Sequence, residues 1–172
     1  KVSNPTNYFK KNLPGIILAS YQILKKFNIV INKKSFNGLN IENEKNKIIS
    51  RLDIVSSETL VIVDGCHNKP SIEIIIDEIN QHKFSKVFFV IGGTKEKNWN
   101  EICKILPNNF FYVVTKPNND RAYSLTKFKK HFDSNNLKYV SFNSLDKSLE
   151  YCKLNYSRNN LIFIGGSLFM VS

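Results

Sequence analysis

Cysteine is scarce in this sequence, and long apolar runs are missing. The three cysteines, Cys66, Cys103 and Cys152, are odd in number and far apart. This spacing fits neither a disulfide framework nor a zinc knuckle, so it indicates a reducing compartment such as the cytoplasm. No apolar run approaches the roughly 20 residues that a helix needs to cross a bilayer, and we expect no membrane partner.

Three common functional motifs are also missing. The turn Gly92–Lys95 lacks the phosphate-loop pattern G-x-x-x-x-G-K-[ST], so its glycines are better explained by a tight turn. Gly165–Ser167 lacks the nucleophile elbow G-x-S-x-G, which argues against a hydrolytic serine and leaves a binding hydroxyl or a helix cap. The dinucleotide fingerprint G-x-G-x-x-G follows none of the predicted strands.

Positive charge dominates the residues that are present. The sequence has 25 Lys and Arg against 14 Asp and Glu, a net charge of +11. A nucleic-acid-binding protein and a solvated basic surface both fit this balance. Because the lysines are scattered and no aromatic-basic signature of an RNA-binding module occurs, we favour the solvated surface and expect no specific nucleic acid. The positive field would also favour small anionic ligands.

The first 50 residues differ from the rest in their pattern of apolar and polar residues. Apolar residues at helical spacing predict a helix from about Asn12 to Phe27, with Pro14 in its first turn. Residues 28–50 are polar and are expected to form a connector with at most one short helix. The sequence starts without Met, so we expect it to belong to a longer chain. We divide it into residues 1–50, the end of a preceding domain, and residues 51–172, a separate domain.

From residue 51 onward, apolar runs of strand length alternate with helical patterns. Continuous runs such as Val87–Ile91 suit strands that are buried on both faces. Helical spacing separates the runs, as in Ile72–Ile79, and Ser144 is placed to cap the last helix. The alternation predicts a Rossmann-like α/β fold, a mainly parallel sheet with helices on both faces. The runs are Leu52–Val55 at an edge, Thr59–Val63, Val87–Ile91, Phe110–Val114, Tyr139–Phe142 and Leu161–Ile164.

Four predicted strand ends carry polar or glycine-rich turns, and ligands of open α/β sheets bind beyond such ends. The turn Asp64–Asn68 is the most informative, because it places a carboxylate, an imidazole and free backbone N–H groups at a helix start. A carboxylate suits a ribose diol, and a helix N-terminus capped by Asn68 favours anions. In the alternative interpretation, Asp64 and Asn68 only satisfy turn amides and His67 is a surface residue. The four turns are Asp64–Asn68, Gly92–Lys95, Thr115–Asn118 and Gly165–Ser167.

Together these segments resemble the carboxy-terminal domain of the bifunctional dihydrofolate synthase/folylpolyglutamate synthase family, within the Mur ligase group. Asp64–Asn68 is similar to the family's Asp-Gly-Ala-His-Asn, and Ser50–Leu52 to its Gly-Arg-Trp or Gly-Arg-Leu. Lys116–Ala122 resembles its Pro-Asn-x-x-Arg-Ala segment, and Leu161–Val171 its final strand and Gly-Ser-Leu turn. Tyr8–Asn12 is similar to its Tyr-Gln-x-x-Asn. The order and spacing of these segments carry the resemblance, which covers nearly the whole chain.

The sequence departs from the family's pattern at several positions. Phe9 replaces Gln and Cys66 replaces Ala. Ser50 replaces Gly at the hinge that lets the two domains close. Lys69 replaces the commoner Pro and adds a cation, which either favours anionic ligands or faces solvent. The family's Asp-Lys-Asp element is replaced by Lys95–Asn98, to which we assign no role.

The resemblance implies an ATP-dependent, amide-forming acid–amino-acid ligase. In this family ATP phosphorylates a carboxyl group of dihydropteroate, or the terminal glutamate carboxyl of a folate, and the amine of L-glutamate attacks the acyl phosphate. The expected partners are therefore L-glutamate and dihydropteroate or folate polyglutamates. The active site lies between two domains, and the amino-terminal ATPase domain carries the phosphate loop and most magnesium contacts. We therefore expect residues 51–172 to hold no metal, the chain to be inactive alone, and the protein to be a monomer.

The family's functional residues carry over position by position. Arg51 would contact the ATP phosphates and offset developing negative charge. Asp64 would hold the ribose hydroxyls, with Asn68 beside the nucleotide, and His67 and Ser167 would bind or orient glutamate. Arg51 and His67 are the candidate catalytic residues, which act by positioning and electrostatics. The alternatives are a non-catalytic nucleotide-binding Rossmann-like module and a Mur-type ligase domain with another acid substrate.

Overall fold

The computed structural model describes residues 7–29 and 52–170. The chain divides into two compact units, Lys1–Ile48 and Ile49–Ser172. The predicted connector lies almost wholly outside the described residues. The short helix expected there stays a prediction, as does the assignment of residues 1–50 to the end of another domain.

Helix α1 is the described element of the first unit and spans Asn7–Lys26. It starts earlier than the predicted Asn12, so the prediction that Pro14 lies in the first turn is wrong. A proline inside a helix has no N–H for the carbonyl one turn earlier, which costs about 3 kcal/mol. Lys25 and Lys26 lie in the last turn, where cations offset the negative end of the helix dipole. No helix among the described residues is long and apolar enough to cross a membrane.

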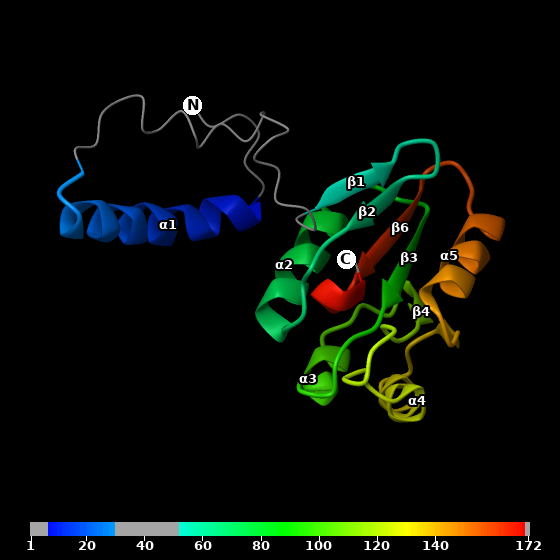
Figure 1. Ribbon diagram of the computed structural model, residues 1–172. Coiled ribbons are helices and arrows are strands. Elements are labelled where there is room, and N and C mark those ends of the chain that lie inside the picture. The colour runs from blue at the N-terminus through cyan, green and yellow to red at the C-terminus, as the bar shows by residue number, and fades with distance from the viewer. Residues whose placement is uncertain (1–6, 30–51, 171–172) are drawn as a thin grey trace. The chain divides into compact units, whose positions relative to one another are not determined.

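The second unit is built on a six-stranded sheet with the strand order β1-β2-β6-β3-β4-β5 (Figure 1). Neighbours from β2 to β5 pair in parallel, and β1 is antiparallel to β2. This confirms the mainly parallel α/β sheet. The strands are β1 Asp53–Ser56, β2 Val61–Val63, β3 Lys86–Ile91, β4 Phe111–Val114, β5 Tyr139–Ser141 and β6 Asn160–Gly165.

Helices cover both faces of the sheet (Figure 1). The chain steps outward from β2 through β3 and β4 to β5 by way of α2, α3 and α4, which pack on one face. It returns through α5 on the other face and inserts β6 between β2 and β3. The return through α5 reverses both the direction in which the chain crosses the sheet and the face that its helix covers. All crossovers between parallel strands therefore keep the same hand. The helices are α2 Lys69–Asn80, α3 Trp99–Cys103, α4 Leu125–Ser134, α5 Leu145–Leu154 and the 3₁₀ turn η3 Leu168–Met170.

Strand β3 shows why its sequence has no polar alternation. Phe89 packs toward α2, α3 and α4, whereas Phe88 packs toward α5, and both are fully buried. The predicted strand buried on both faces is thus confirmed. Trp99 is also buried, with its ring 4.4 Å from that of Phe128, and Ser144 caps α5 by accepting a hydrogen bond from Lys147 N–H.

Glycines bring the turns after β3 and β6 into backbone contact. Gly166 has a φ of +102°, and a Cβ there would collide with the carbonyl oxygen of Gly92. A Cβ on Gly93 would lie 2.7 Å from the carbonyl oxygen of Gly166, and one on Gly165 would lie 2.8 Å from the sulfur of Cys66. Close packing between turns therefore explains these glycines, in agreement with the tight-turn interpretation of Gly92–Lys95.

Replacing Gly166 by alanine is expected to lower the free energy of unfolding of the second unit by at least about 2 kcal/mol, because the positive φ and the Gly92 contact both oppose a Cβ. Chemical denaturation would measure this change. Gly15→Ala is the matched control, since a Cβ on Gly15 meets no atom within 4 Å. Equal stability of the Gly166→Ala variant and the unaltered protein would contradict the close packing.

Candidate functional site

The four polar turns predicted from the sequence lie at one edge of the sheet. Val63 of β2 pairs with Ile164 of β6, and Ile91 of β3 pairs with Gly165 of β6. Ile91 also pairs with Val114 of β4. The parallel strands therefore end together, and their turns share the edge at which ligands of such sheets bind. At this edge β6 lies between β2 and β3, where the strand order reverses.

Two backbone hydrogen bonds join the turn after β2 to the end of β6 and to the turn that follows β6. Asp64 N–H donates to the carbonyl of Ile164 at 3.0 Å, and Gly166 N–H donates to the carbonyl of Cys66 at 2.8 Å. Cys66 is buried between the two turns. The junction brings the turn that carries His67 beside the turn that carries Ser167, so two of the predicted site residues come from adjoining segments.

Asp64 is a buried carboxylate that organises backbone groups. Its Oδ1 accepts a hydrogen bond from Cys66 N–H at 2.7 Å, within its own turn. Its Oδ2 accepts one from Leu52 N–H at 3.0 Å, across to the segment that leads into β1. Leu52 has a φ of +52°, a conformation that is unusual for a branched residue. Asp64 therefore satisfies turn amides, as the alternative interpretation expected, and also fixes the residue that follows Arg51.

Arg51 itself lies outside the described residues. The structure places its neighbour Leu52 against Asp64, but the predicted contact of Arg51 with ATP phosphates stays a prediction.

His67 is half-buried and has a defined orientation. Its Nδ1 lies 2.8 Å from the carbonyl oxygen of Gly65. Because a carbonyl only accepts hydrogen bonds, Nδ1 must carry the hydrogen, and Nε2 of the neutral ring is then an acceptor. Nε2 has no hydrogen-bond partner among the residues that the structure describes. The ring is therefore fixed at one nitrogen and available at the other.

Asn68 caps helix α2, as predicted. Its Oδ1 accepts a hydrogen bond from Ser71 N–H at 3.0 Å, and the two residues form a capping box. Ser71 Oγ also accepts hydrogen bonds from the N–H groups of His67 and Asn68. The prediction of free backbone N–H groups in this turn is therefore wrong for residues 66–68, because Asp64 and Ser71 already bind them.

Ser167 is buried and begins the 3₁₀ turn η3. Its Oγ accepts a hydrogen bond from Phe169 N–H at 3.2 Å, and its carbonyl accepts one from Met170 N–H at 3.0 Å. The residue is thus a cap, one of the two alternatives for this serine. A hydroxyl that accepts one hydrogen bond still has its own hydrogen to donate.

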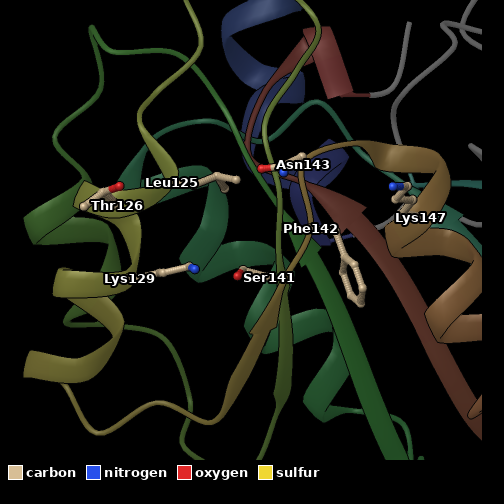
Figure 2. A pocket seen from close by; sticks show the side chains of 7 residues that line it. All are labelled: Leu125, Thr126, Lys129, Ser141, Phe142, Asn143 and Lys147. Carbon is tan, nitrogen blue, oxygen red and sulfur yellow. The ribbon is translucent and has the colours of Figure 1, made fainter.

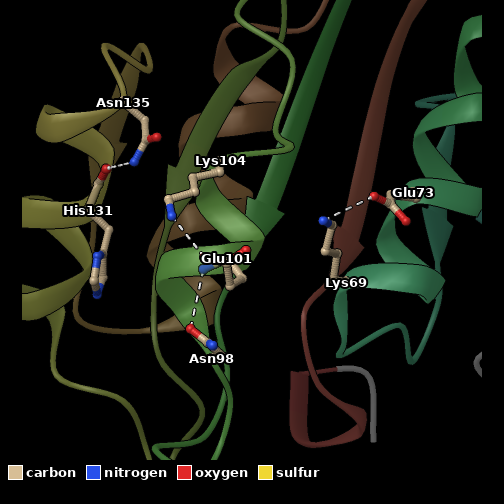
Figure 3. A network of polar contacts seen from close by, with 7 residues as sticks. All are labelled: Lys69, Glu73, Asn98, Glu101, Lys104, His131 and Asn135. Atoms are coloured by element: carbon tan, nitrogen blue, oxygen red, sulfur yellow. Dashed lines mark hydrogen bonds and ion pairs between the residues drawn. The ribbon is translucent and has the colours of Figure 1, made fainter.

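Lys69, which replaces the family's commoner Pro after this turn, forms an ion pair along its own helix. Its Nζ lies 3.9 Å from Glu73 Oε1, and both side chains are about half exposed (Figure 3). The exposed pair adds little stability. Glu73 thus offsets part of the cation's attraction for an anionic ligand.

A second group of residues at this edge was missed by sequence reasoning. Arg121 Nε donates to Glu96 Oε1 at 2.8 Å, and its guanidinium carbon lies 5.7 Å from the ring centre of Phe169. The hydrogen bond from Arg121, followed by one from Thr94, lowers the pKa of Glu96 to about 2. The pair joins the loops after β3 and β4. Phe169, whose ring Arg121 contacts, follows Ser167 by two residues in the sequence. Arg121 belongs to the segment that resembles the family's Pro-Asn-x-x-Arg-Ala, which was its one signal in the sequence.

Within residues 7–29 and 52–170, no group of three or more His, Cys, Asp and Glu side chains is arranged to hold a metal ion.

Comparison with known proteins identifies similar folds. No curated protein sequence matches the chain. In fold the chain is similar to E. coli FolC in complex with DHPP and ADP, at 17% identity and a TM-score of 0.69, over 83% of this chain and 33% of that one. It is similar to Mycobacterium tuberculosis folylpolyglutamate synthase complexed with ADP, at 15% identity and a TM-score of 0.73, over 90% and 37%.

A third similar structure is a bifunctional folylpolyglutamate synthase/dihydrofolate synthase with Mn, AMPPNP and L-glutamate bound, at 15% identity and a TM-score of 0.69, over 83% and 34%. At these identities the likeness shows the fold, and the chain spans about a third of the length of each structure. The sequence model of the family described as "Mur ligase, glutamate ligase domain" matches residues 50–168. The chain therefore belongs to the Mur ligase family, as its glutamate ligase domain.

Proposed function

We propose that this chain is the carboxy-terminal domain of an ATP-dependent folate–glutamate ligase, which covers ATP and binds L-glutamate for attack on an acyl phosphate. The observation that carries the proposal is the junction of the β2 and β6 turns, where Gly166 N–H binds the Cys66 carbonyl at 2.8 Å. This junction brings the turns of His67 and Ser167 together. Membership of the Mur ligase family supports the ligase class.

The glutamate side of the proposed site uses an imidazole and a hydroxyl. With Nδ1 held by the Gly65 carbonyl, neutral His67 would accept a hydrogen bond from the amino group of glutamate through Nε2. The protonated ring would instead donate to a carboxylate. Ser167 would donate its hydroxyl hydrogen to a glutamate carboxylate while its oxygen keeps the Phe169 N–H.

The nucleotide side would be formed by Arg51, Asp64 and Asn68. Asp64 is proposed to face the ribose hydroxyls, and its hydrogen bond to Leu52 N–H at 3.0 Å holds the backbone next to Arg51. One carboxylate would thus position the nucleotide contact on one side and, through Cys66 N–H, the turn of His67 on the other. A change at Asp64 would affect both halves of the site.

In the proposed reaction, the terminal phosphoryl group of ATP passes to a carboxylate oxygen of dihydropteroate or a folate, and ADP leaves. The glutamate nitrogen then attacks the acyl carbon. The bond from carbon to the phosphate oxygen breaks, phosphate leaves, and the nitrogen loses a proton as the amide forms. The residues of this chain would position the reactants and offset charge. Magnesium and the phosphate loop are assigned to an amino-terminal ATPase domain, which is the proposed partner.

The first test is ADP release by a complete ligase that contains this chain, supplied with ATP and with either dihydropteroate or tetrahydrofolate. Turnover is expected to depend on L-glutamate, because the acyl phosphate needs its amine. Reactions without glutamate are the control. A folded protein that binds ATP but turns over with neither pterin would contradict the folate assignment and favour a Mur-type ligase with another acid substrate.

Replacing His67 by alanine is expected to lower kcat/KM for glutamate about 10- to 100-fold, the loss of one hydrogen bond to a charged group. Glutamate-dependent ADP release measures this change, and thermal unfolding checks that the variant is folded. His82→Ala is the matched control, because His82 lies exposed beyond the far end of α2. Equal kinetics of the two variants would remove His67 from the site.

Replacing Asp64 by asparagine is expected to lower the free energy of unfolding by about 1–3 kcal/mol, because an amide NH₂ would face a backbone N–H that needs an acceptor. Chemical denaturation measures the loss. Asp77→Asn, on the exposed side of α2, is the control that keeps the same charge change. If both variants are equally stable, Asp64 does not organise the turn.

A further inference from the structure

A second polar hollow lies beyond the end of β5, outside the site described above (Figure 2). Its volume is about 380 Å³, within the range of about 300–1,000 Å³ typical of small-molecule sites. Figure 2 shows side chains of α4 on one side and of α5 on the other, with the tip of β5 between them. The lining residues are Leu125, Thr126, Lys129, Ser141, Phe142, Asn143 and Lys147.

The lining of this hollow is cationic. Lys129 comes from α4 and Lys147 from α5, and none of the seven lining residues is acidic. Thr126, Ser141 and Asn143 add two hydroxyls and an amide, which are hydrogen-bond donors to anions. In Figure 2 the Lys129 side chain extends from α4 toward Ser141. The arrangement suits an anionic ligand that also accepts neutral hydrogen bonds.

The hollow lies at the same edge of the sheet as the proposed glutamate site. Ser141 of β5 pairs with Val114 of β4, and Val114 is in register with Ile91 and, through it, with Gly165 of β6. Strand β5 is three places from β6. At a spacing of about 4.8 Å between strands, the two sites are about 14 Å apart across the sheet.

We propose that this hollow, the β5 pocket, binds carboxylates of a glutamyl chain that is already attached to the substrate. The inference rests on the proposed function, since such a chain is the product of repeated glutamate ligation. An extended α-linked chain spans at most about 3.3–3.6 Å per residue, and a γ-linked glutamyl residue has two more bonds in the chain and spans about 6 Å, so about three residues reach from Ser167 to the β5 pocket. Shorter chains would leave it empty.

The positions of the two lysines favour a chain of carboxylates over a single phosphate. They belong to helices on opposite faces of the sheet, with Phe142 and Asn143 between them in Figure 2. A chain that crosses the end of β5 would pass both ammonium groups and pair each with a different carboxylate. A phosphate group is compact and favours donors that converge on one point.

The test is binding of tetra-γ-glutamate to the isotopically labelled 172-residue chain, followed by NMR and calorimetry. Saturable shifts are expected at the amides of Ser141, Phe142 and Asn143, and L-glutamate alone should not cause them. The double variant Lys129→Gln, Lys147→Gln is expected to weaken binding about fivefold or more, the scale of two exposed ion pairs. The variant Lys130→Gln, Lys153→Gln removes the same charge from the same helices outside the pocket and should bind normally.

Absence of these shifts, or equal weakening by both double variants, would overturn the proposal, because binding would then reflect net charge alone. Tighter binding of inorganic phosphate than of tetraglutamate at the same amides would also overturn it. None of these measurements needs catalysis. Failure of glutamate-dependent turnover would therefore contradict the proposed function, whereas failure of tetraglutamate binding would contradict the β5 pocket.

Discussion

The contact between the backbones of Gly92 and Gly166 holds together strands that are far apart in the sequence. Since neither residue has a side chain, the turns after β3 and β6 touch, and Gly166 N–H reaches the Cys66 carbonyl of the β2 turn. The ends of β2, β3 and β6 are thereby joined through their backbones. The described candidate residues take their positions from it: His67 follows Cys66, and Ser167 follows Gly166. The site is therefore a property of how closely backbones approach, more than of any single side chain.

Much of the fold was predictable because apolar runs and helical spacing report burial directly. All six strands and the four α-helices between β2 and β6 were expected, and Val87–Ile91 was recognised as buried on both faces. The strand order was not predicted. Strands β3 and β6 are equally apolar, so their composition does not indicate which strand each one pairs with. Thr59 and Leu60 were taken into a strand but form the turn before β2, since a hairpin with β1 needs residues to reverse direction. The start of α1 was wrong because apolar spacing marks a face rather than an end.

The site was predictable to the extent that strand ends share an edge. Asp64, His67, Asn68 and Ser167 lie there, although their contacts with ligands stay proposals. Ser71 accepts hydrogen bonds from the N–H groups of His67 and Asn68. These bonds were not foreseen, because a serine in the first turn of a helix is usually expected to face solvent. Arg121 and Glu96 are 25 residues apart in two irregular loops, and no periodicity connects them. Lys129 and Lys147 share a pocket only because β5 brings their helices together.

Strand β6 is the last of the six to be synthesised, yet it lies in the middle of the sheet. Until it forms, β2 has only β1 beside it, and β3 has only β4, so a nascent chain carries two sheet fragments with unpaired inner edges. Such edges invite pairing with other chains, and the long loop that β6 must close slows folding. Emergence of Asn160–Gly165 from the ribosome would therefore be the event that converts two aggregation-prone halves into one domain. Translation pausing before this segment would lengthen the hazardous interval, and chaperone binding would be most useful there.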